Sequence, residues 1–195
     1  TGMGIEAASI FAISLVIAPD VGGWTLAPIL FVYDIGVGLA TAQLTSVILG
    51  EVPPEDSGQA SGMQSTFRQV GSALGIALIG TLLAVNLNNL TAQELEGVTF
   101  LPDQAREGIA EAVSASAGQL LPALRDGALP QFGEMPAMDL GPEVMEPIVS
   151  AIERSFADSA SQSAMVAAIF VLAGFALSFR IPNLIFYSKD EPATE

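Results

Sequence analysis

The chain has 195 residues, of which six are Lys or Arg, 21 are Asp or Glu and none is His or Cys, so its formal net charge is −15. This composition excludes disulfides, catalysis by His or Cys, the usual zinc ligand sets and a basic nucleic-acid surface. Because 51% of the residues are nevertheless apolar, charged and apolar side chains must occupy different parts of the chain. Acidic residues gather between Glu94 and Asp158, whereas the stretch Ser159–Phe179 carries no charge.

Four segments are apolar enough to predict membrane-spanning helices, since a bilayer core of about 30 Å takes about 20 apolar helical residues to cross. A soluble domain with four buried core helices is the alternative, but the chain holds too little amphipathic sequence to cover four such helices. The sequence therefore predicts an all-α integral membrane protein. Its four predicted spans are Met3–Ala18, Thr25–Gly50, Ala60–Leu87 and Ser161–Arg180.

The connections between these segments predict the topology. Residues 1–87 hold three spans, residues 88–160 form a long loop, residues 161–187 hold the last span and its exit, and residues 188–195 form a polar tail. Four crossings place both ends of the chain on one side of the membrane. Arg180 and Lys189 favour the cytoplasm for that side. We therefore expect a multi-pass protein of the cell membrane, with residues 88–160 extracytoplasmic.

The long loop is acidic and has helical periodicity. Its Asp and Glu residues outnumber its Arg residues twelve to three between Glu94 and Asp158, which indicates a solvated acidic cap or a surface that captures cations. No calcium-loop pattern is present, and we expect no bound metal. Gly127–Pro142 is rich in Gly, Pro and Met and is expected to be irregular. Two amphipathic helices are predicted from the apolar positions Ile109, Val113, Leu120, Leu121 and Leu124, and Val144, Ile148, Ile152 and Phe156.

Asp34 lies about nine residues into the second predicted span, which at 1.5 Å per residue is near the middle of the bilayer. Together with Gly38, Thr41 and Thr45 it forms one polar or small stripe along the helix. An ionisable residue inside a membrane helix is costly and is a functional candidate for that reason. Asp34 is therefore expected either to take up and release a proton or to make a structural hydrogen bond to a neighbouring helix.

Arg68 lies in the polar first half of the third predicted span. It shares a stripe with Ser61, Ser65 and Ser72, and Gln64 precedes it by four residues. An Arg side chain cannot act as the proton carrier because it stays protonated. Arg68 is expected to pair with a carboxylate, contact substrate, hold a gate, or extend its head group to the cytoplasmic interface.

Glu6 and four glycines complete the set of candidate residues. Glu6 lies near the start of the first span and is either interfacial or part of a proton or substrate pathway. The glycines are candidates for close helix packing or bending, as are small residues in membrane helices generally. They are Gly36, Gly38, Gly71 and Gly75. Motifs of hydrolases, metalloproteases and phosphate-binding loops are absent from the sequence, so neither an enzyme nor a cofactor is expected.

The run GVGLATAQLTSVILGEVPPEDSGQASGMQSTFRQVGSALGIALIGTLL at Gly36–Leu83 joins a Gly-rich helix, a short VPPEDSGQASG loop and a helix with FRQVGSALG. This pattern resembles the C-terminal part of the major facilitator superfamily, in particular the fourteen-helix drug–proton antiporters. The later run ADSASQSAMVAAIFVLAGFAL resembles the last helix of that family, entered from an extracytoplasmic loop.

The resemblance implies that the four helices are the eleventh to fourteenth of fourteen and that upstream helices complete the protein. It implies export of small amphipathic compounds in exchange for protons, by alternating access within the lipid bilayer. Arg68 matches a recurrent Arg of the family, whereas Asp34 matches no family motif. A non-transporting four-helix scaffold or partner subunit, and a superfamily carrier of another substrate class, are the alternatives.

Overall fold

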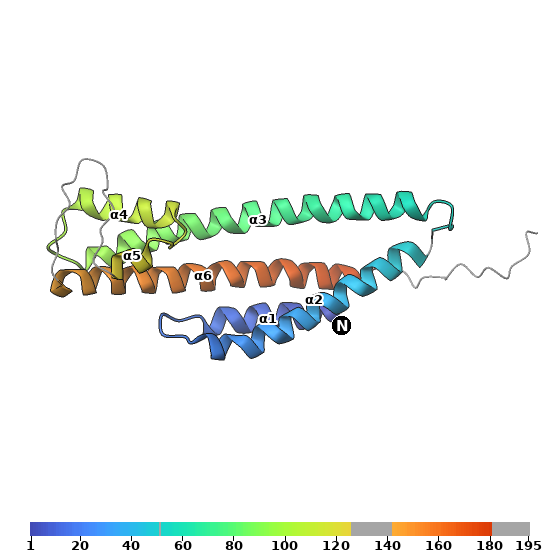
Figure 1. Ribbon diagram of the computed structural model, residues 1–195, viewed down its shortest axis with the longest axis horizontal. Helices are drawn as coiled ribbons and strands as arrows, with labels where there is room; N and C mark the ends of the chain where they lie inside the picture. The colour runs from blue at the N-terminus through green and yellow to red at the C-terminus, as the bar shows by residue number, and fades with distance from the viewer. Residues whose placement is uncertain (51, 126–141, 181–195) are drawn as a thin grey trace, which may run out of the picture.

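The computed structural model describes residues 1–50, 52–125 and 142–180, which form helices, turns and short connections with no strand among them. This confirms the predicted all-helical class. Figure 1 shows the helices along one long axis. Their bounds are α1 Gly2–Val16, α2 Gly23–Gly50, α3 Ser57–Glu96, α4 Asp103–Ala115, α5 Leu121–Arg125 and α6 Pro142–Ser178.

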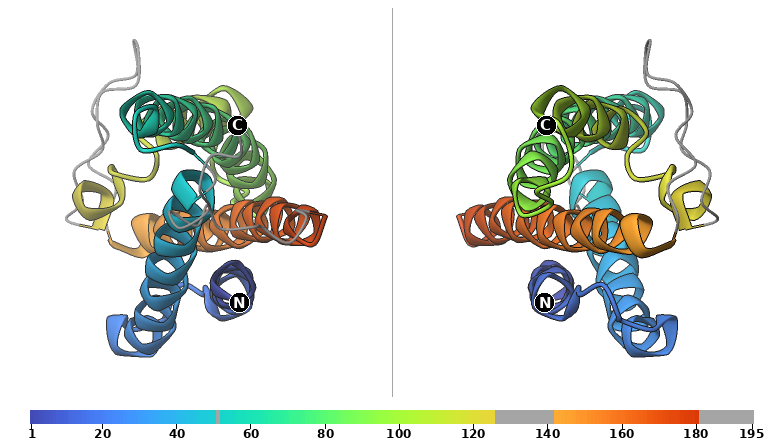
Figure 2. Two further views of the ribbon diagram at one scale, coloured as in Figure 1. Left: turned by 90° about the vertical axis from the view of Figure 1, so that its right-hand side faces the viewer. Right: turned by 90° about the vertical axis from the view of Figure 1, so that its left-hand side faces the viewer.

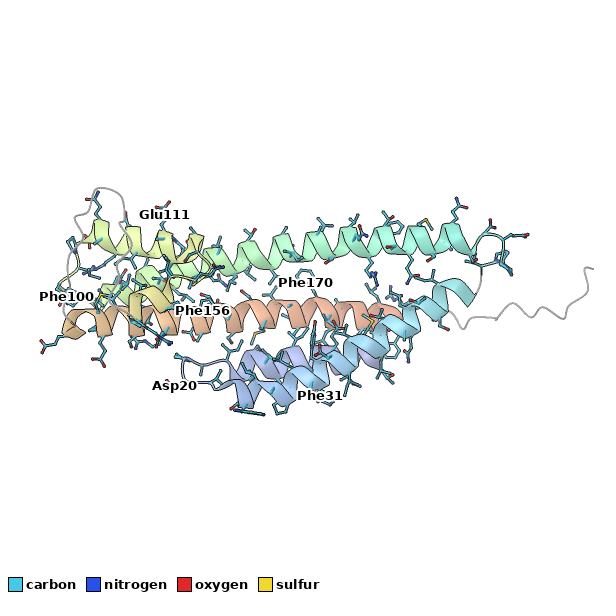
Figure 3. The ribbon with its side chains drawn as sticks, viewed as in Figure 1. Asp20, Phe31, Phe100, Glu111, Phe156 and Phe170 are labelled. Carbon is cyan, nitrogen blue, oxygen red and sulfur yellow. The ribbon has the colours of Figure 1, made fainter. Side chains whose placement is uncertain are left out.

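Three helices within the described residues are long and apolar enough to cross a membrane, namely Gly23–Ile48, Ser57–Glu96 and Met145–Ser178. The first predicted span, Met3–Ala18, corresponds to α1, a shorter apolar helix of 15 residues. Most large apolar side chains of the long helices are exposed, including Phe31 and Phe170 in Figure 3. Such surfaces need lipid or further helices to cover them, so the fold is that of a helical membrane protein.

Two helices continue beyond the spans predicted from hydropathy. The third span was predicted to end at Leu87, but α3 runs on to Glu96. The second amphipathic helix of the loop and the last span were predicted separately, yet both belong to the continuous α6. No helix-breaking residue separates them, because between Phe156 and Ser161 the chain reads Ala-Asp-Ser-Ala. Hydropathy marks where an apolar run ends, whereas the backbone hydrogen bonds of a helix continue past that point.

α6 lies in the middle of the molecule, with α3 and α4 on one side and α1 on the other, and α2 runs obliquely from the side of α1 toward α3 (Figure 2). α3 and α6 run antiparallel. The side-chain amide of Asn86 donates to Gln162 Oε1 at 3.2 Å, and Arg154 Nε bonds Glu94 Oε2 at 2.9 Å. The two bonds lie eight residues apart on α3 and also on α6. The two helices therefore keep one register over about 12 Å.

The C-terminal end of α3 and the N-terminal part of α6 pack with α4 and α5 into a small helical bundle, which we call the cap. Its core contains buried apolar side chains from all four helices, among them Leu95, Val113, Leu124, Ile148 and Ile152. Of the apolar positions predicted for the loop, Ile109, Val113, Leu124, Ile148 and Ile152 are buried in this core, and Leu120, Leu121 and Phe156 pack against it. The first expected helix is two, α4 and α5. The turn between α4 and α5 passes through Ala117 and Gly118 at positive φ, and a Cβ at Gly118 would meet the Phe156 ring at 2.6 Å.

The three Arg residues of the cap all pair with carboxylates. Arg125 contacts Glu153 at 2.6 Å, Arg154 contacts Glu94, and Arg106 contacts Asp103. No group of three or more Asp or Glu side chains in the described part of the chain is gathered closely enough to hold a metal ion. The irregular stretch predicted at Gly127–Pro142 lies outside the described residues except for Pro142, as does everything after Arg180.

Candidate functional site

α1 and α2 approach each other through glycine. A Cβ added at Gly36 would lie 2.7 Å from the backbone nitrogen of Glu6, and one at Gly2 would lie 2.5 Å from that of Ala40. Only residues without a Cβ permit so short a distance between helix backbones. The contact therefore places Glu6 of α1 directly against Gly36 of α2. Gly36 follows Asp34 by two residues.

Along the bundle axis, Asp34 of α2 lies near the level of the middle of the apolar part of α6, which packs on α1. On one side of this level Gly4 packs at the ring of Phe175, and on the other Ser161 donates a hydrogen bond to the carbonyl of Ser14 at 2.5 Å. Glu6 and the α2 residues opposite it fall between these two contacts. The side chain of Asp34 is exposed. It projects from the side of α2 away from Gly36, since two residues correspond to a rotation of about 200°.

Gln64 and Thr45, two of the predicted candidates, are brought together from different helices. Gln64 Nε2 donates to Thr45 Oγ1 at 3.1 Å, and the Thr45 hydroxyl donates to the carbonyl of Thr41 at 3.1 Å. This bond sets the rotation of α2 and α3 about their axes near the loop that joins them. On α3 the positions that share the face of Gln64 are Arg68, Gly71 and Gly75, and on α2 those that share the face of Thr45 are Thr41, Gly38 and Asp34.

From this bond the two helices diverge, as Figure 1 shows. A Cβ at Gly38, Gly71 or Gly75 would meet no atom within 4 Å, and Arg68 is exposed. Ser65 is half-buried beside Gln64. The ion pairs found among the described residues do not include Glu6, Asp34 or Arg68. One hydrogen bond, between Gln64 and Thr45, thus sets the position of the polar stripes on α2 and α3. Beyond this bond the two helices separate, and both stripes are exposed.

An open apolar groove of about 470 Å³ lies between α1 and α2. Its walls are aliphatic apart from one hydroxyl, and Val32 at its edge is two residues from Asp34. Such a surface suits an apolar chain or ring more than a charged group. The residues that line the groove are Ile5, Ala8, Ser9, Ala12, Pro28, Ile29 and Val32.

Several polar contacts between helices were not foreseen from the sequence. Asn86 with Gln162 joins α3 to α6, and Ser161 with Ser14 joins α6 to α1. Polar residues at the edges of apolar runs are a weak signal for such bonds, because they often join membrane helices. The partner of each residue depends on helix order and register, which the local pattern does not contain.

Long helices with open apolar surfaces, crossed by a few polar and ionisable side chains, define a multi-pass helical membrane protein. Comparison with curated proteins adds the proteins to which this chain is similar. The probable actinorhodin transporter of Streptomyces coelicolor is 27% identical over 93% of this chain and 34% of its own length. The multidrug resistance protein Stp of Mycobacterium tuberculosis is 38% identical over 42% of this chain and 15% of its own length.

A third relative, the tetracenomycin C resistance and export protein of Streptomyces glaucescens, is 30% identical over 72% of this chain and 24% of its own length. The chain is therefore similar to a part of each of these transport, resistance and export proteins, which agrees with its resemblance to the drug–proton antiporters of the major facilitator superfamily. It spans about a third or less of the length of these curated relatives. No family model matches the chain, and no solved structure matches it.

Proposed function

We propose that this chain supplies the last four membrane helices of a transporter that exports small amphipathic compounds in exchange for protons. The observation that carries the proposal is the likeness to the probable actinorhodin transporter, which covers 93% of the chain. The Stp and tetracenomycin C proteins are likewise named for resistance or export. These names favour export over a scaffold or partner subunit, and over a carrier of another substrate class within the superfamily.

In the proposed topology α1, α2, α3 and α6 all cross the bilayer. α1 is short, but it packs antiparallel against α2 through Gly36 and against α6 through Ser14, as a spanning helix would. The cap forms a water-exposed bundle with its own apolar core, which is suited to the extracytoplasmic side. The loop between α2 and α3 and both ends of the chain are then cytoplasmic. Arg180, just beyond α6, agrees with the excess of positive charge on that side.

The proposed pathway runs between the diverging faces of α2 and α3. Upstream helices of the same polypeptide would supply the opposite wall, because an alternating-access pore is built from two structural repeats. Asp34, near mid-length and without an ion pair among the described residues, is the proposed proton-binding group. The bond between Gln64 and Thr45 would hold the two faces at the cytoplasmic end.

Arg68 is proposed as a fixed positive charge on this pathway, one helical turn from Gln64. Its exposure in the described structure also fits an interfacial side chain that extends toward lipid head groups. In either role the charge stays on the guanidinium. Arg68 therefore acts on carboxylates and substrate through its fixed charge and its N–H donors, and not by carrying the proton.

Dye efflux by the full polypeptide in energised membrane vesicles tests the proposal. We expect Asp34→Asn to abolish proton-dependent efflux, because an amide cannot bind and release the proton. Arg68→Ala should impair efflux and Arg68→Lys should restore a part of it. Asp20→Asn, in the exposed turn between α1 and α2, is the matched control and should be active. Normal efflux by Asp34→Asn and Arg68→Ala at equal membrane expression would refute the assigned roles.

A further inference from the structure

Hydroxyl side chains on the helices of this protein commonly bond the backbone of their own helix. Ser14, Thr45, Thr66, Thr81 and Ser155 each donate to a carbonyl three or four residues earlier, at 2.7 to 3.1 Å. The shortest of these are Ser14 and Thr81 at 2.7 Å. This arrangement satisfies a hydroxyl in an apolar environment without a second helix.

Three buried hydroxyls depart from this arrangement. Thr91 and Ser159 have no exposed surface, and Ser163 retains 4%. Their Oγ atoms have no hydrogen-bond partner among the described residues. A buried hydroxyl without a partner loses its bonds to water and gains nothing in exchange, so such groups are rare in folded proteins.

By the register of α3 and α6, Thr91 and Ser159 lie at nearly the same level of the crossing, and Ser163 lies one turn of α6 further along. Thr91 lies between Asn86 and Glu94 on α3, whose side chains bond Gln162 and Arg154 of α6. Ser159 lies between those two partners, and Ser163 follows Gln162 directly. The two side-chain bridges therefore bracket Thr91 and Ser159 within the stretch of about 12 Å over which the helices keep register.

Small side chains recur on α6 along this crossing. Ala151, Ser155, Ser159 and Ser163 recur every four residues on α6 and form one ridge along it. Ser155 on this ridge is fully buried and bonds the carbonyl of Ala151 at 2.8 Å. The same helix thus presents one satisfied hydroxyl and, in the next two turns, two unsatisfied ones.

We propose that the crossing of α3 and α6 binds an ordered water between the hydroxyls of Thr91 and Ser159. A buried water makes two to four hydrogen bonds, and each hydroxyl offers one donor and two acceptor positions. One water can bond the hydroxyls of both helices at the same time. A hydroxyl that bonds a carbonyl of its own helix makes no link to the other helix. The resulting joint can exchange hydrogen bonds when the helices shift, and it does not depend on the proposed export function.

Thermal unfolding of the full polypeptide in lipid nanodiscs tests this site. We expect Thr91→Val and Ser159→Ala each to lower the unfolding temperature by more than the matched control Ser155→Ala, whose hydroxyl is already satisfied. The double variant Thr91→Val with Ser159→Ala should unfold close to either single variant, because the two share one water. Thr91→Ser, which keeps the hydroxyl, should unfold closer to the unmodified protein than Thr91→Val does.

If the site is dry, removing an unsatisfied hydroxyl leaves stability unchanged or raises it. Higher or equal unfolding temperatures for Thr91→Val and Ser159→Ala would therefore overturn the proposal. A high-resolution map of the unmodified full polypeptide gives an independent result. Density within hydrogen-bond distance of Thr91 Oγ1 and Ser159 Oγ supports bound water. Hydroxyls turned onto their own helix carbonyls, or bonded to a side chain from elsewhere in the polypeptide, would refute it.

Discussion

Gly36 shows how a single missing Cβ sets the distance between two helices. Its neighbour across the contact is the backbone of Glu6, at 2.7 Å from the place where a Cβ would stand. Gly38, two residues along the same helix, has nothing within 4 Å. The sequence marked both glycines as candidates for helix packing, and it offered no reason to prefer one. The difference arises because α1 lies on only one side of α2.

This contrast gives a prediction at the scale of the residue. Gly36→Ala should destabilise the protein by about 1–3 kcal/mol, because the added methyl group forces the backbones of α1 and α2 apart. Gly38→Ala should leave stability unchanged or raise it, since Ala favours helix over Gly by up to about 1 kcal/mol. Thermal unfolding of the purified full polypeptide compares the two. Equal effects of both substitutions would contradict the packing of α1 on α2 described above.

At the scale of the element, α3 and α6 are the best-defined pair. Two side-chain bridges eight residues apart on both helices fix their antiparallel register. The cap core extends this contact through Leu95 and Ile152. In contrast, the first half of α3 makes one side-chain bond to α2, through Gln64. α3 therefore makes more contacts with other helices at its C-terminal end, in the cap, than at its N-terminal end.

The register can be checked by cross-linking, because the chain has no native Cys. Asn86→Cys paired with Gln162→Cys should form a disulfide under mild oxidation in a full polypeptide otherwise free of Cys. Asn86→Cys paired with Asp158→Cys, one helical turn out of register, is the control and should react much more slowly. Gel mobility after proteolysis between the two sites reports the bond. Efficient cross-linking of the control pair alone would refute the described register.

At the scale of the whole molecule, the cap and the apolar helices belong to different surroundings. The cap has a buried apolar core and surface ion pairs, as a water-exposed bundle has. The other ends of α2, α3 and α6 present large apolar side chains outward, among them Phe67 and Leu177. One end of the molecule is thus suited to water and the remainder to lipid or further helices.

The proposed topology gives a prediction at this scale. In intact cells a membrane-impermeant maleimide should label Glu111→Cys on α4, because the cap is proposed to be extracytoplasmic. The same reagent should label Glu55→Cys, in the loop between α2 and α3, only after the cells are opened. Both positions are exposed, so access to the reagent depends on the side of the membrane. Labelling in the reverse pattern would show that the orientation is inverted.

The size of the natural polypeptide is a further check at the same scale. The chain has a mass of 20.1 kDa, whereas the relatives it matches are about three times as long or longer. An intact mass more than twice 20.1 kDa for the polypeptide purified from its own membranes is expected if upstream helices exist. A mass near 20.1 kDa would instead favour the scaffold or partner subunit.

The sequence by itself determined the helical membrane class, the apolar segments and the buried faces of the cap helices. These follow from hydropathy and from periodicity, which are local properties of residues such as Ile109, Val113 and Ile148. It also identified Gln64 and Thr45 as candidates, because polar residues stand out in an apolar run. Whether Asp34 and Arg68 carry the proposed roles stays a prediction.

Only the tertiary structure decided which residues meet. It joined Gln64 to Thr45, set Glu6 against Gly36, and gathered Thr91 and Ser159 at one crossing. It also merged the second loop helix and the last span into α6. The physical reason is that contacts between helices depend on their order, register and rotation. These properties arise from packing over the whole chain, and no local pattern of residues contains them.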